Sequence, residues 1–278
     1  MSPSASNPFE YTPIEKVRTY WNSNPCNFGY SRAPFGTKEY FDDVERERYI
    51  RESHIPAFAD FEKWRGKRVL EIGCGMGTDT INFARHGAFV TAVDLSEKSL
   101  EIARQRAQLF GLQDFITFFQ VNAEELSKAL PKEKYDLIYS FGVIHHTPHP
   151  ENVLSQLKGY THPDTVLKIM VYHRYSWAVL WILLKGKCAF WKLDDLIAKY
   201  SESQNCPIIY TYSKSSVKNI FHGYEIQKIS VEFSVSQANH FITLYRKSNL
   251  FFHVLHPVFS FFGKPFGWHL CITAKPTS

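Results

Sequence analysis

The feature that most constrains this chain is a glycine-rich turn between a short apolar run and a helix-like segment. Residues 67–73 (KRVLEIG) have the pattern of a buried strand, and the turn continues through Gly75 and Gly77. Glycine accepts backbone angles that other residues avoid, so the chain can bend sharply here and approach a ligand closely. The helix that follows would present free N–H groups and its positive dipole end to that ligand. This order of elements predicts the ligand-binding turn of an α/β fold.

Strand-like and helix-like segments continue to alternate along the chain. Ser96 is placed to begin a helix and Gly111 to end it. Such alternation predicts a parallel sheet with helices on both faces. The last two strands lack a full crossover helix between them, so we expect a mostly parallel seven-stranded sheet with an antiparallel last strand. The further expected strands are 88–95, 115–121, 135–140, 166–172, 224–233 and 268–274, and the expected helices are 78–86, 96–110 and 151–159.

The remaining segments predict an arm and a lid around this sheet. We expect an N-terminal part that covers the site, and a sheet domain with two insertions. The insertions would lie over the carboxyl end of the sheet, where open α/β sheets bind ligands. The expected ranges are 1–65 for the first part (an extended arm over 1–37 and a helix over 38–64), 66–278 for the domain, and about 173–216 and 237–265 for the insertions.

The charge is unevenly distributed but indicates no nucleic-acid partner. Residues 151–278 carry 14 Lys and Arg against 7 Asp and Glu, in a chain of 278 residues with net charge +5. This basic half suits an anionic partner, although solvated surface charge is the simpler interpretation. The dense Lys/Arg run that nucleic-acid binders usually carry is missing from the sequence.

The cysteines and the apolar runs indicate in which cellular compartment the protein resides and whether it spans a membrane. The five cysteines are an odd number with no C-x-x-C pair, which favours a reducing compartment and a cytoplasmic protein. The longest apolar run, residues 177–184, is shorter than the roughly 18 residues that a membrane-spanning helix needs. The aromatic stretches 177–191 and 251–266 are compatible with peripheral membrane contact, but a lid packed on the core is the preferred interpretation.

Two acidic residues near the glycine turn restrict which ligands the turn can bind. Asp94 ends the second strand, where a carboxylate can accept hydrogen bonds from two ribose hydroxyls. The same arrangement binds NAD, but the dinucleotide fingerprint G-x-G-x-x-G needs a glycine where this chain has Thr78; its third glycine comes one residue earlier, at Gly77. Glu71, two residues before the first glycine, favours a cationic ligand. S-adenosylmethionine (SAM), which carries an ammonium and a sulfonium, therefore fits better than NAD.

Residues 66–172 resemble the class I SAM-dependent methyltransferases, particularly the small-molecule methyltransferases of ubiquinone and menaquinone biosynthesis. The resemblance implies a Rossmann-like fold and an enzyme that takes its methyl group from SAM and releases S-adenosylhomocysteine (SAH). The matching segments are residues 71–77 (EIGCGMG), 93–96 (VDLS), 122–126 (NAEEL) and 135–146 (YDLIYSFGVIHH).

The resemblance also implies which residues bind SAM. The acid and the glycine turn would hold its methionine part, and Asp94 its ribose. Asn122 and Ala123 would lie along the adenine, although an Asp is common in the family where Asn122 stands. Side chains at the end of the fourth strand would line the same pocket. The expected cofactor-binding residues are Glu71, Gly73, Cys74, Gly75, Gly77, Asp94, Leu95, Asn122, Ala123, Ser140 and Phe141.

The candidate catalytic residues are histidines at the same edge of the sheet. Methyl transfer from a sulfonium is an in-line displacement that depends mainly on positioning in a water-poor pocket, and a hydroxyl acceptor also needs a base. His145 and His146 follow the fourth strand and His173 the fifth. Histidine titrates near neutral pH and can take up such a proton. Alternatively, these are loop histidines that bond to local backbone groups.

Four further residues are candidates for binding the acceptor. Tyr172 and Arg174 end the fifth strand, where Arg174 is either a ligand for an acceptor carboxylate or phosphate or an ordinary surface cation. Tyr20 and Trp21 lie in the arm, where they either close the site or pack on the core. We expect a small-molecule acceptor, anionic or lipid-like. We expect no metal, because no His, Asp and Glu cluster has ligand spacing.

These patterns favour one function and leave two alternatives open. The leading hypothesis is transfer of a methyl group from SAM to an oxygen or nitrogen of a small organic acceptor. One alternative is an NAD(P)-dependent oxidoreductase that uses the same turn. The other is a non-catalytic SAM-binding module whose basic, aromatic half contacts a partner. The acceptor's identity and the oligomeric state do not follow from the sequence.

Overall fold

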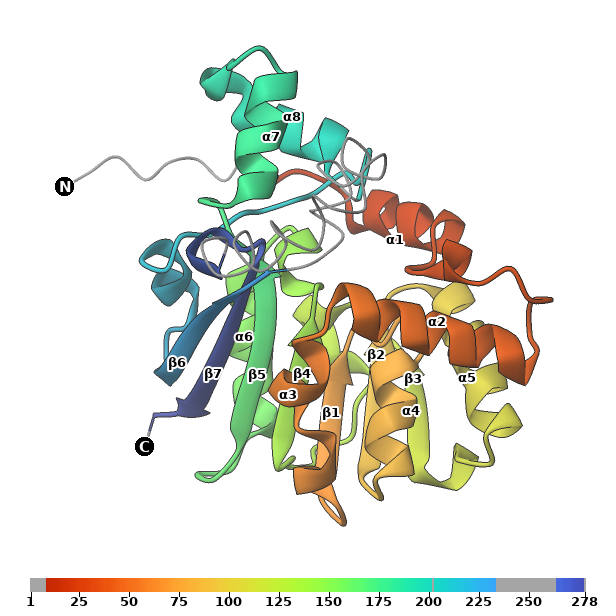
Figure 1. Ribbon diagram of the computed structural model, residues 1–278. Helices are drawn as coiled ribbons and strands as arrows, with labels where there is room; N and C mark the ends of the chain where they lie inside the picture. Colours follow the sequence, from red (N-terminus) through yellow and green to blue (C-terminus); the bar gives the residue numbers. More distant parts are fainter. Residues whose placement is uncertain (1–8, 202, 234–263, 278) are drawn as a thin grey trace.

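A seven-stranded sheet organises the described part of the chain, residues 9–201, 203–233 and 264–277 of the computed structural model (Figure 1). The strand order is β3-β2-β1-β4-β5-β7-β6. β7 runs antiparallel to β5 and β6, and the other neighbours pair in parallel. The expected mostly parallel sheet with an antiparallel last strand is confirmed. The strands are β1 (Arg68–Ile72), β2 (Phe89–Asp94), β3 (Ile116–Gln120), β4 (Leu137–Phe141), β5 (Val166–Tyr172), β6 (Tyr224–Glu232) and β7 (His269–Pro276).

Helices cover both faces of the sheet (Figure 1). In β1, Leu70 and Ile72 pack into the cluster that includes α6, whereas Val69 packs into the cluster of α3, α4 and α5. Ser96 begins α5 as expected, because its Oγ accepts a hydrogen bond from the Ser99 N–H at 3.1 Å. The helices are α1 (Ile14–Ser23), α2 (Lys38–Arg51), α3 (Ile55–Ala59), α4 (Thr78–Arg85), α5 (Glu97–Leu109), α6 (Pro150–Leu157), α7 (Trp177–Lys185) and α8 (Leu193–Tyr200).

The N-terminal segment differs from the expected extended arm and single helix. Residues 14–23 form α1, in which Ile14, Val17 and Trp21 recur at helical spacing, and Val17 is buried. The expected helix over 38–64 is interrupted after α2. Pro56 lies in the first turn of α3 and has no N–H to donate, so one helix cannot run through this point.

Arg106 of α5 joins α2 to the sheet domain. Its fully buried guanidinium donates to Thr78 Oγ1 at 2.7 Å and to Glu45 Oε2 at 3.0 Å. Burial lowers the pKa of Arg106 to about 10, against the opposing charge of Glu45. Because a buried charge is tolerated only when it is paired, this contact fixes α2 in one position over the sheet.

The segment that follows β5 lies over the carboxyl ends of the strands, where α7 and α8 stand together (Figure 1). Val179, Ile182 and Ile197 of these helices are buried in one cluster with Met170 and Trp268. The other expected insertion, 237–265, lies outside the described residues except for its last two. Among the helices that the structure describes, none is both long and apolar enough to cross a membrane.

Candidate functional site

A cavity of about 500 Å³ lies at the carboxyl ends of the central strands, between the sheet and helices α1 and α2. The order of strands reverses here, because β2 and β4 lie on opposite sides of β1, and open α/β sheets bind ligands at such a point. The cavity brings together most of the site residues expected from the sequence. Those that line it are Tyr20, Trp21, Glu71, Gly73, Cys74, Gly75, Asp94, Leu95, Asn122, Ala123, Phe141, His146 and Tyr172.

The glycine turn is fixed to the end of β2 by hydrogen bonds. The Gly73 N–H donates to Val93 O at 2.7 Å, and the Gly75 N–H donates to Asp94 Oδ2 at 2.8 Å. The other carboxylate oxygen, Oδ1, accepts the Ser96 N–H at 2.8 Å. Burial raises the pKa of Asp94 despite these donors. Each Asp94 oxygen keeps lone-pair capacity for a ligand hydroxyl.

Glu71 is buried behind the turn and accepts a hydrogen bond from Thr80 Oγ1 at 2.5 Å. Burial and the nearby Asp79 carboxylate raise the pKa of Glu71 well above its ordinary value. A cation in the cavity would stabilise the ionised form of Glu71 and oppose this shift.

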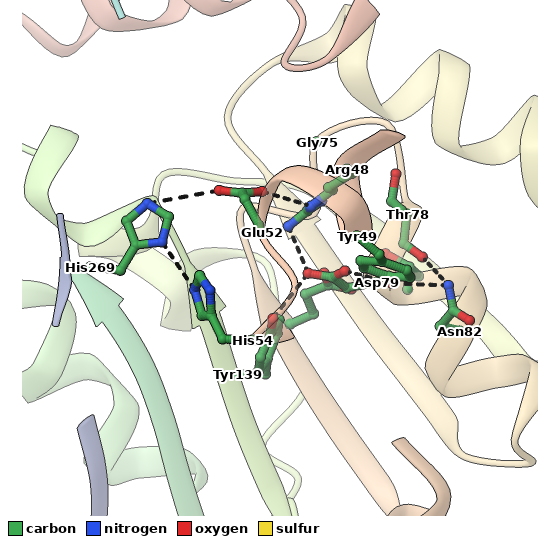
Figure 2. A network of polar contacts seen from close by, with 12 residues as sticks. Arg48, Tyr49, Glu52, His54, Gly75, Thr78, Asp79, Asn82, Tyr139 and His269 are labelled. Atoms are coloured by element: carbon green, nitrogen blue, oxygen red, sulfur yellow. Dashed lines mark hydrogen bonds and ion pairs between the residues drawn. The ribbon is translucent and has the colours of Figure 1, made fainter. Parts of the chain in front are cut away.

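Asp79, in the first turn of α4, is held by three side chains (Figure 2). Its Oδ2 accepts from Arg48 Nη2 at 2.8 Å and from Tyr139 Oη at 3.0 Å, and its Oδ1 accepts from Tyr49 Oη at 3.0 Å. Glu52 lies 3.5 Å from Arg48 Nε. Although burial works against the charge, Asp79 and Glu52 raise the pKa of Arg48. The guanidinium is therefore a permanent positive charge at the cavity wall.

The charged lining is predominantly acidic. In the described part of the chain, Arg48 is the only Lys or Arg side chain at the cavity wall. Carboxyl groups outnumber it, and a cation in the cavity would favour their ionised forms, whereas a pyrophosphate would oppose them. The carboxyl groups belong to Glu52, Glu71, Asp79 and Asp94.

Aromatic rings form the wall of the cavity beside β5 and α1. The ring of His146, in the turn η5 (Ile144–His146), lies 5.2 Å from that of Trp21 and 5.6 Å from that of Tyr172. His146 Nδ1 donates to Ile208 O at 2.7 Å, since a carbonyl can only accept. Burial lowers the pKa of His146 to about 4, so the ring is neutral at physiological pH.

Five expected site residues lie outside this lining. Gly77 immediately precedes α4, where a Cβ would lie 3.1 Å from Ala103 Cβ, and Ser140 is buried within β4. The ring of His145 lies against that of Tyr172, with ring centroids 3.9 Å apart and the ring planes tilted by 43°. The other two are engaged elsewhere: His173 Nδ1 donates to Gly267 O at 3.0 Å, and Arg174 pairs with Asp194 at 3.1 Å and with Thr211. The positions of His145, His173 and Arg174 outside the lining give no support to roles in catalysis or acceptor binding.

The cavity also contains functional groups that the sequence reasoning missed. Arg48 and Glu52 were part of a charged run that resembles a solvated helix face, but they continue the buried face of Tyr40 and Val44 at intervals of four residues. That spacing is the signal that would have found them. The missed lining residues with polar or soft side chains include Arg48, Glu52, Asp79, Met170 and His269.

Comparison with known proteins gives a family match and partial relatives. The family model described as a methyltransferase domain matches residues 63–232. The ubiquinone biosynthesis O-methyltransferase of Actinobacillus pleuropneumoniae is 33% identical over 122 residues, which are 43% of this chain and 51% of that protein. The corresponding enzyme of Neisseria meningitidis is 35% identical over 116 residues, 41% of this chain and 47% of that one. The chain thus spans about half the length of the curated relatives that it matches.

Solved structures match over more of the chain at lower identity. Magnesium protoporphyrin IX methyltransferase from Synechocystis with bound SAH has a TM-score of 0.59 and 17% identity, covering 95% of this chain and 100% of that one. Geranyl diphosphate C-methyltransferase from Streptomyces coelicolor has a TM-score of 0.57 and 15% identity, covering 99% and 100%. At these identities the likeness concerns the fold alone, and it confirms the expected Rossmann-like methyltransferase fold.

Proposed function

The chain belongs to the family of methyltransferase domains, and from this premise we propose that it transfers a methyl group from SAM to an oxygen or nitrogen atom of a small organic acceptor. The reaction is an in-line displacement at the methyl carbon. The protein's part is to align donor and acceptor in a cavity from which water is largely excluded.

The charge of the cavity is the observation that carries this proposal. In the described lining, four carboxyl groups accompany one guanidinium, and the sulfonium and ammonium of SAM would stabilise the ionised form of the buried Glu71. The pyrophosphate of NAD would place two negative charges among these carboxylates. The oxidoreductase alternative is therefore disfavoured, in agreement with the early third glycine at Gly77.

Residues around the glycine turn would bind the donor. Asp94 would accept hydrogen bonds from the ribose hydroxyls, because its oxygens keep lone pairs beyond those that bind Gly75 and Ser96. Arg48 would pair with the methionine carboxylate, and Glu71 would pair with the ammonium. Asn122 would lie along the adenine beside Ala123.

The acceptor would lie against the aromatic wall formed by Trp21, His146 and Tyr172. The curated relatives are named for O-methylation in ubiquinone biosynthesis, and an aromatic wall fits an acceptor with a planar, apolar part. Arg174, the expected ligand for an acidic group on the acceptor, is engaged by Asp194 outside the cavity. We therefore favour an apolar or lipid-like acceptor over an anionic one.

Peripheral membrane contact is part of this proposal. The turn η7 (Phe190–Lys192) lies between α7 and α8. Its aromatic residues are largely exposed to solvent, Phe190 by 70% and Trp191 by 72% of the residue surface. Lys187 and Lys192 flank these rings. Exposed aromatic and basic side chains together are suited to the interface of an anionic bilayer, from which a lipid-like acceptor would be taken. A cytoplasmic location remains a prediction from the cysteine content.

Isothermal calorimetry with SAH, and separately with NADH, tests the donor site. We expect SAH to bind and Asp94→Ala to weaken its binding tenfold or more, about 1.4 kcal/mol. The matched control is Asp114→Ala, which removes an exposed carboxylate and is expected to leave SAH affinity unchanged. Binding of NADH without SAH would overturn the proposal. SAH binding without methyl product from any member of a broad acceptor library would favour the non-catalytic alternative.

Sedimentation with lipid vesicles tests the membrane contact. We expect the protein to sediment with phosphatidylglycerol vesicles and to remain in solution with phosphatidylcholine vesicles. Replacing Phe190 and Trp191 with Ser should reduce the bound fraction several-fold, because burial of two exposed rings supplies the apolar part of the affinity. Equal sedimentation of the variant and the original protein would contradict this role of the turn.

A further inference from the structure

A second polar group lies at the cavity wall opposite the glycine turn, where α2, α3 and β7 meet. His269 is the first residue of β7 and is fully buried, and it lines the cavity together with Glu52. His269 Nδ1 lies 3.0 Å from His54 Nε2, and His269 Nε2 lies 3.8 Å from Glu52 Oε1. Figure 2 shows Glu52 between His269 and Arg48. Two segments that are distant in the sequence, residues 52–54 and the start of β7, thus bring two histidines and a carboxylate together.

The geometry on the Nε2 side of His269 is incomplete. Within the residues that the structure describes, this nitrogen has no hydrogen-bond partner. Its distance to Glu52, 3.8 Å, is an ion-pair distance and too long for a hydrogen bond. With the hydrogen of the neutral ring on Nδ1, Nε2 can only accept, and a ligand hydroxyl beside it would donate its single hydrogen there. Because buried polar atoms are normally satisfied, this arrangement points to a ligand group that completes it.

We propose that His269 is the general base of the methyl transfer, that Glu52 and His54 position it, and that the acceptor presents a phenolic hydroxyl to its Nε2. This inference rests on the proposed function, because it assigns the proton in the same reaction. It shifts the catalytic role away from His145 and His173, which lie outside the cavity lining.

The step balances within the site. A lone pair of the acceptor oxygen forms the new bond to the methyl carbon, and the pair of the breaking methyl–sulfur bond stays on sulfur, which gives SAH. The acceptor proton moves to His269 Nε2, and Glu52 offsets the charge of the imidazolium. In the tautomer that serves this step, the Nδ1–H of His269 donates to His54 Nε2 throughout, which keeps the Nε2 lone pair available. The proton then leaves to solvent.

The surroundings of His269 determine what kind of acceptor it can serve. Arg48 of α2 faces it, as do Glu52 at the end of α2 and His54 just before α3. His145 faces it from η5, and Glu232 is its cross-strand neighbour on β6. Burial, with His54 and Arg48, holds the pKa of His269 well below its ordinary value. The ring is therefore a neutral but weak base. A weak base suits an acidic hydroxyl, such as a phenol, better than an aliphatic alcohol.

The test uses 4-nitrophenol, whose phenolate absorbs visible light and whose neutral form does not. The probe is added to SAH-saturated protein at about pH 6, below the pH at which the free phenol ionises. We expect a phenolate band from the bound probe, because the phenolate oxygen and Glu52 together stabilise the imidazolium that His269 forms when it takes the proton. His269→Gln, which cannot take up a proton, should reduce that band by about tenfold or more while SAH still binds.

Two further variants keep the test decisive. His173→Gln removes a buried histidine outside the cavity and should leave the band unchanged. Glu52→Gln should reduce the band, because the imidazolium loses its counter-charge, and it decides the matter if His269→Gln fails to fold.

The outcomes separate this inference from the proposed function. If SAH does not bind to the original protein, the proposed function fails. If SAH binds but the probe does not ionise, or if it ionises equally well in His269→Gln, only the assignment of His269 is overturned.

Discussion

At the scale of single residues, two glycines of the turn are needed for different reasons, Gly73 for packing and Gly75 for space at the cavity wall. Gly73 and Gly75 both have positive φ, +74° and +53°. A Cβ on Gly73 would lie 2.2 Å from Val143 Cγ2, whereas a Cβ on Gly75 would meet no protein atom within 4 Å. Gly73 is thus needed for packing, and Gly75 leaves space at the cavity wall.

Gly73→Ala should destabilise the whole protein. The clash with Val143 and the left-handed backbone angle together should lower the free energy of unfolding by about 2–4 kcal/mol, measured by urea denaturation. In the double variant Gly73→Ala, Val143→Ala, the smaller side chain at position 143 should relieve the clash and restore part of the free energy of unfolding. No recovery would show that backbone strain alone accounts for the effect.

Gly75→Ala should affect the ligand more than the fold. We expect a loss of about 1 kcal/mol in unfolding free energy from the backbone angle, and SAH binding weakened about tenfold because the methyl group occupies space at the cavity wall. Gly111→Ala is the matched control. Its φ is +67°, its Cβ would also meet nothing within 4 Å, and it does not line the cavity. Equal SAH affinities in both variants would contradict this account.

At the scale of elements, α1 is attached to the rest of the molecule by a few polar contacts. Asn22 Oδ1 accepts from Ser96 Oγ at 2.8 Å, and Tyr20 Oη donates to Gln204 O at 3.0 Å. The first contact joins α1 to the start of α5, and the second joins it to the segment after α8. Because Tyr20, Trp21 and Asn24 also line the cavity, we expect the release of ligand to depend on how firmly α1 is held.

Asn22→Ala should speed the release of SAH. Losing the Ser96 contact weakens the docking of α1 by about 1 kcal/mol, which corresponds to roughly fivefold faster dissociation if α1 must move for release. Stopped-flow displacement measures the dissociation rate. Thr19→Ala, at an exposed position of the same helix, is the matched control. An unchanged rate in Asn22→Ala would mean that SAH leaves by a route that does not involve α1.

The elements that follow local rules could be predicted from the sequence, and those set by distant contacts could not. The strands and the Ser96 cap were predictable, because alternation and capping are short-range signals. The helix α1 was not predicted, because the Asn, Ser, Pro and Gly content of residues 1–37 indicated an extended arm. Its ten residues give only a short helical pattern. His269 escaped as a functional candidate because it becomes one only when β7 inserts beside β5 and meets α2 and α3. No spacing within one segment could reveal that contact.

At the scale of the whole molecule, buried titratable groups make stability depend on pH in opposing directions. Burial lowers the pKa of His146 and His54 to about 4. It raises the pKa of Glu71, together with Asp79. The histidines bind fewer protons in the folded state than in the unfolded state, whereas Glu71 binds more. The pH dependence of the complete chain is a sum of both, so one group is isolated only by comparison with a variant that lacks it.

His146→Gln should remove one identifiable part of that dependence. As pH falls, the unfolded state protonates His146 near 6.5, but the folded state does so only near 4, so the stability present above 6.5 is lost across this interval. The loss is at most about 1.4 kcal/mol per pH unit. In urea denaturation between pH 7.5 and pH 4, the original protein should therefore lose about 2–3 kcal/mol more than His146→Gln. His222→Gln, at an exposed position, controls for the substitution itself. Parallel pH profiles for the original protein and His146→Gln would mean that His146 has the same pKa in the folded and the unfolded states, and that burial beside Trp21 does not disfavour its charged form.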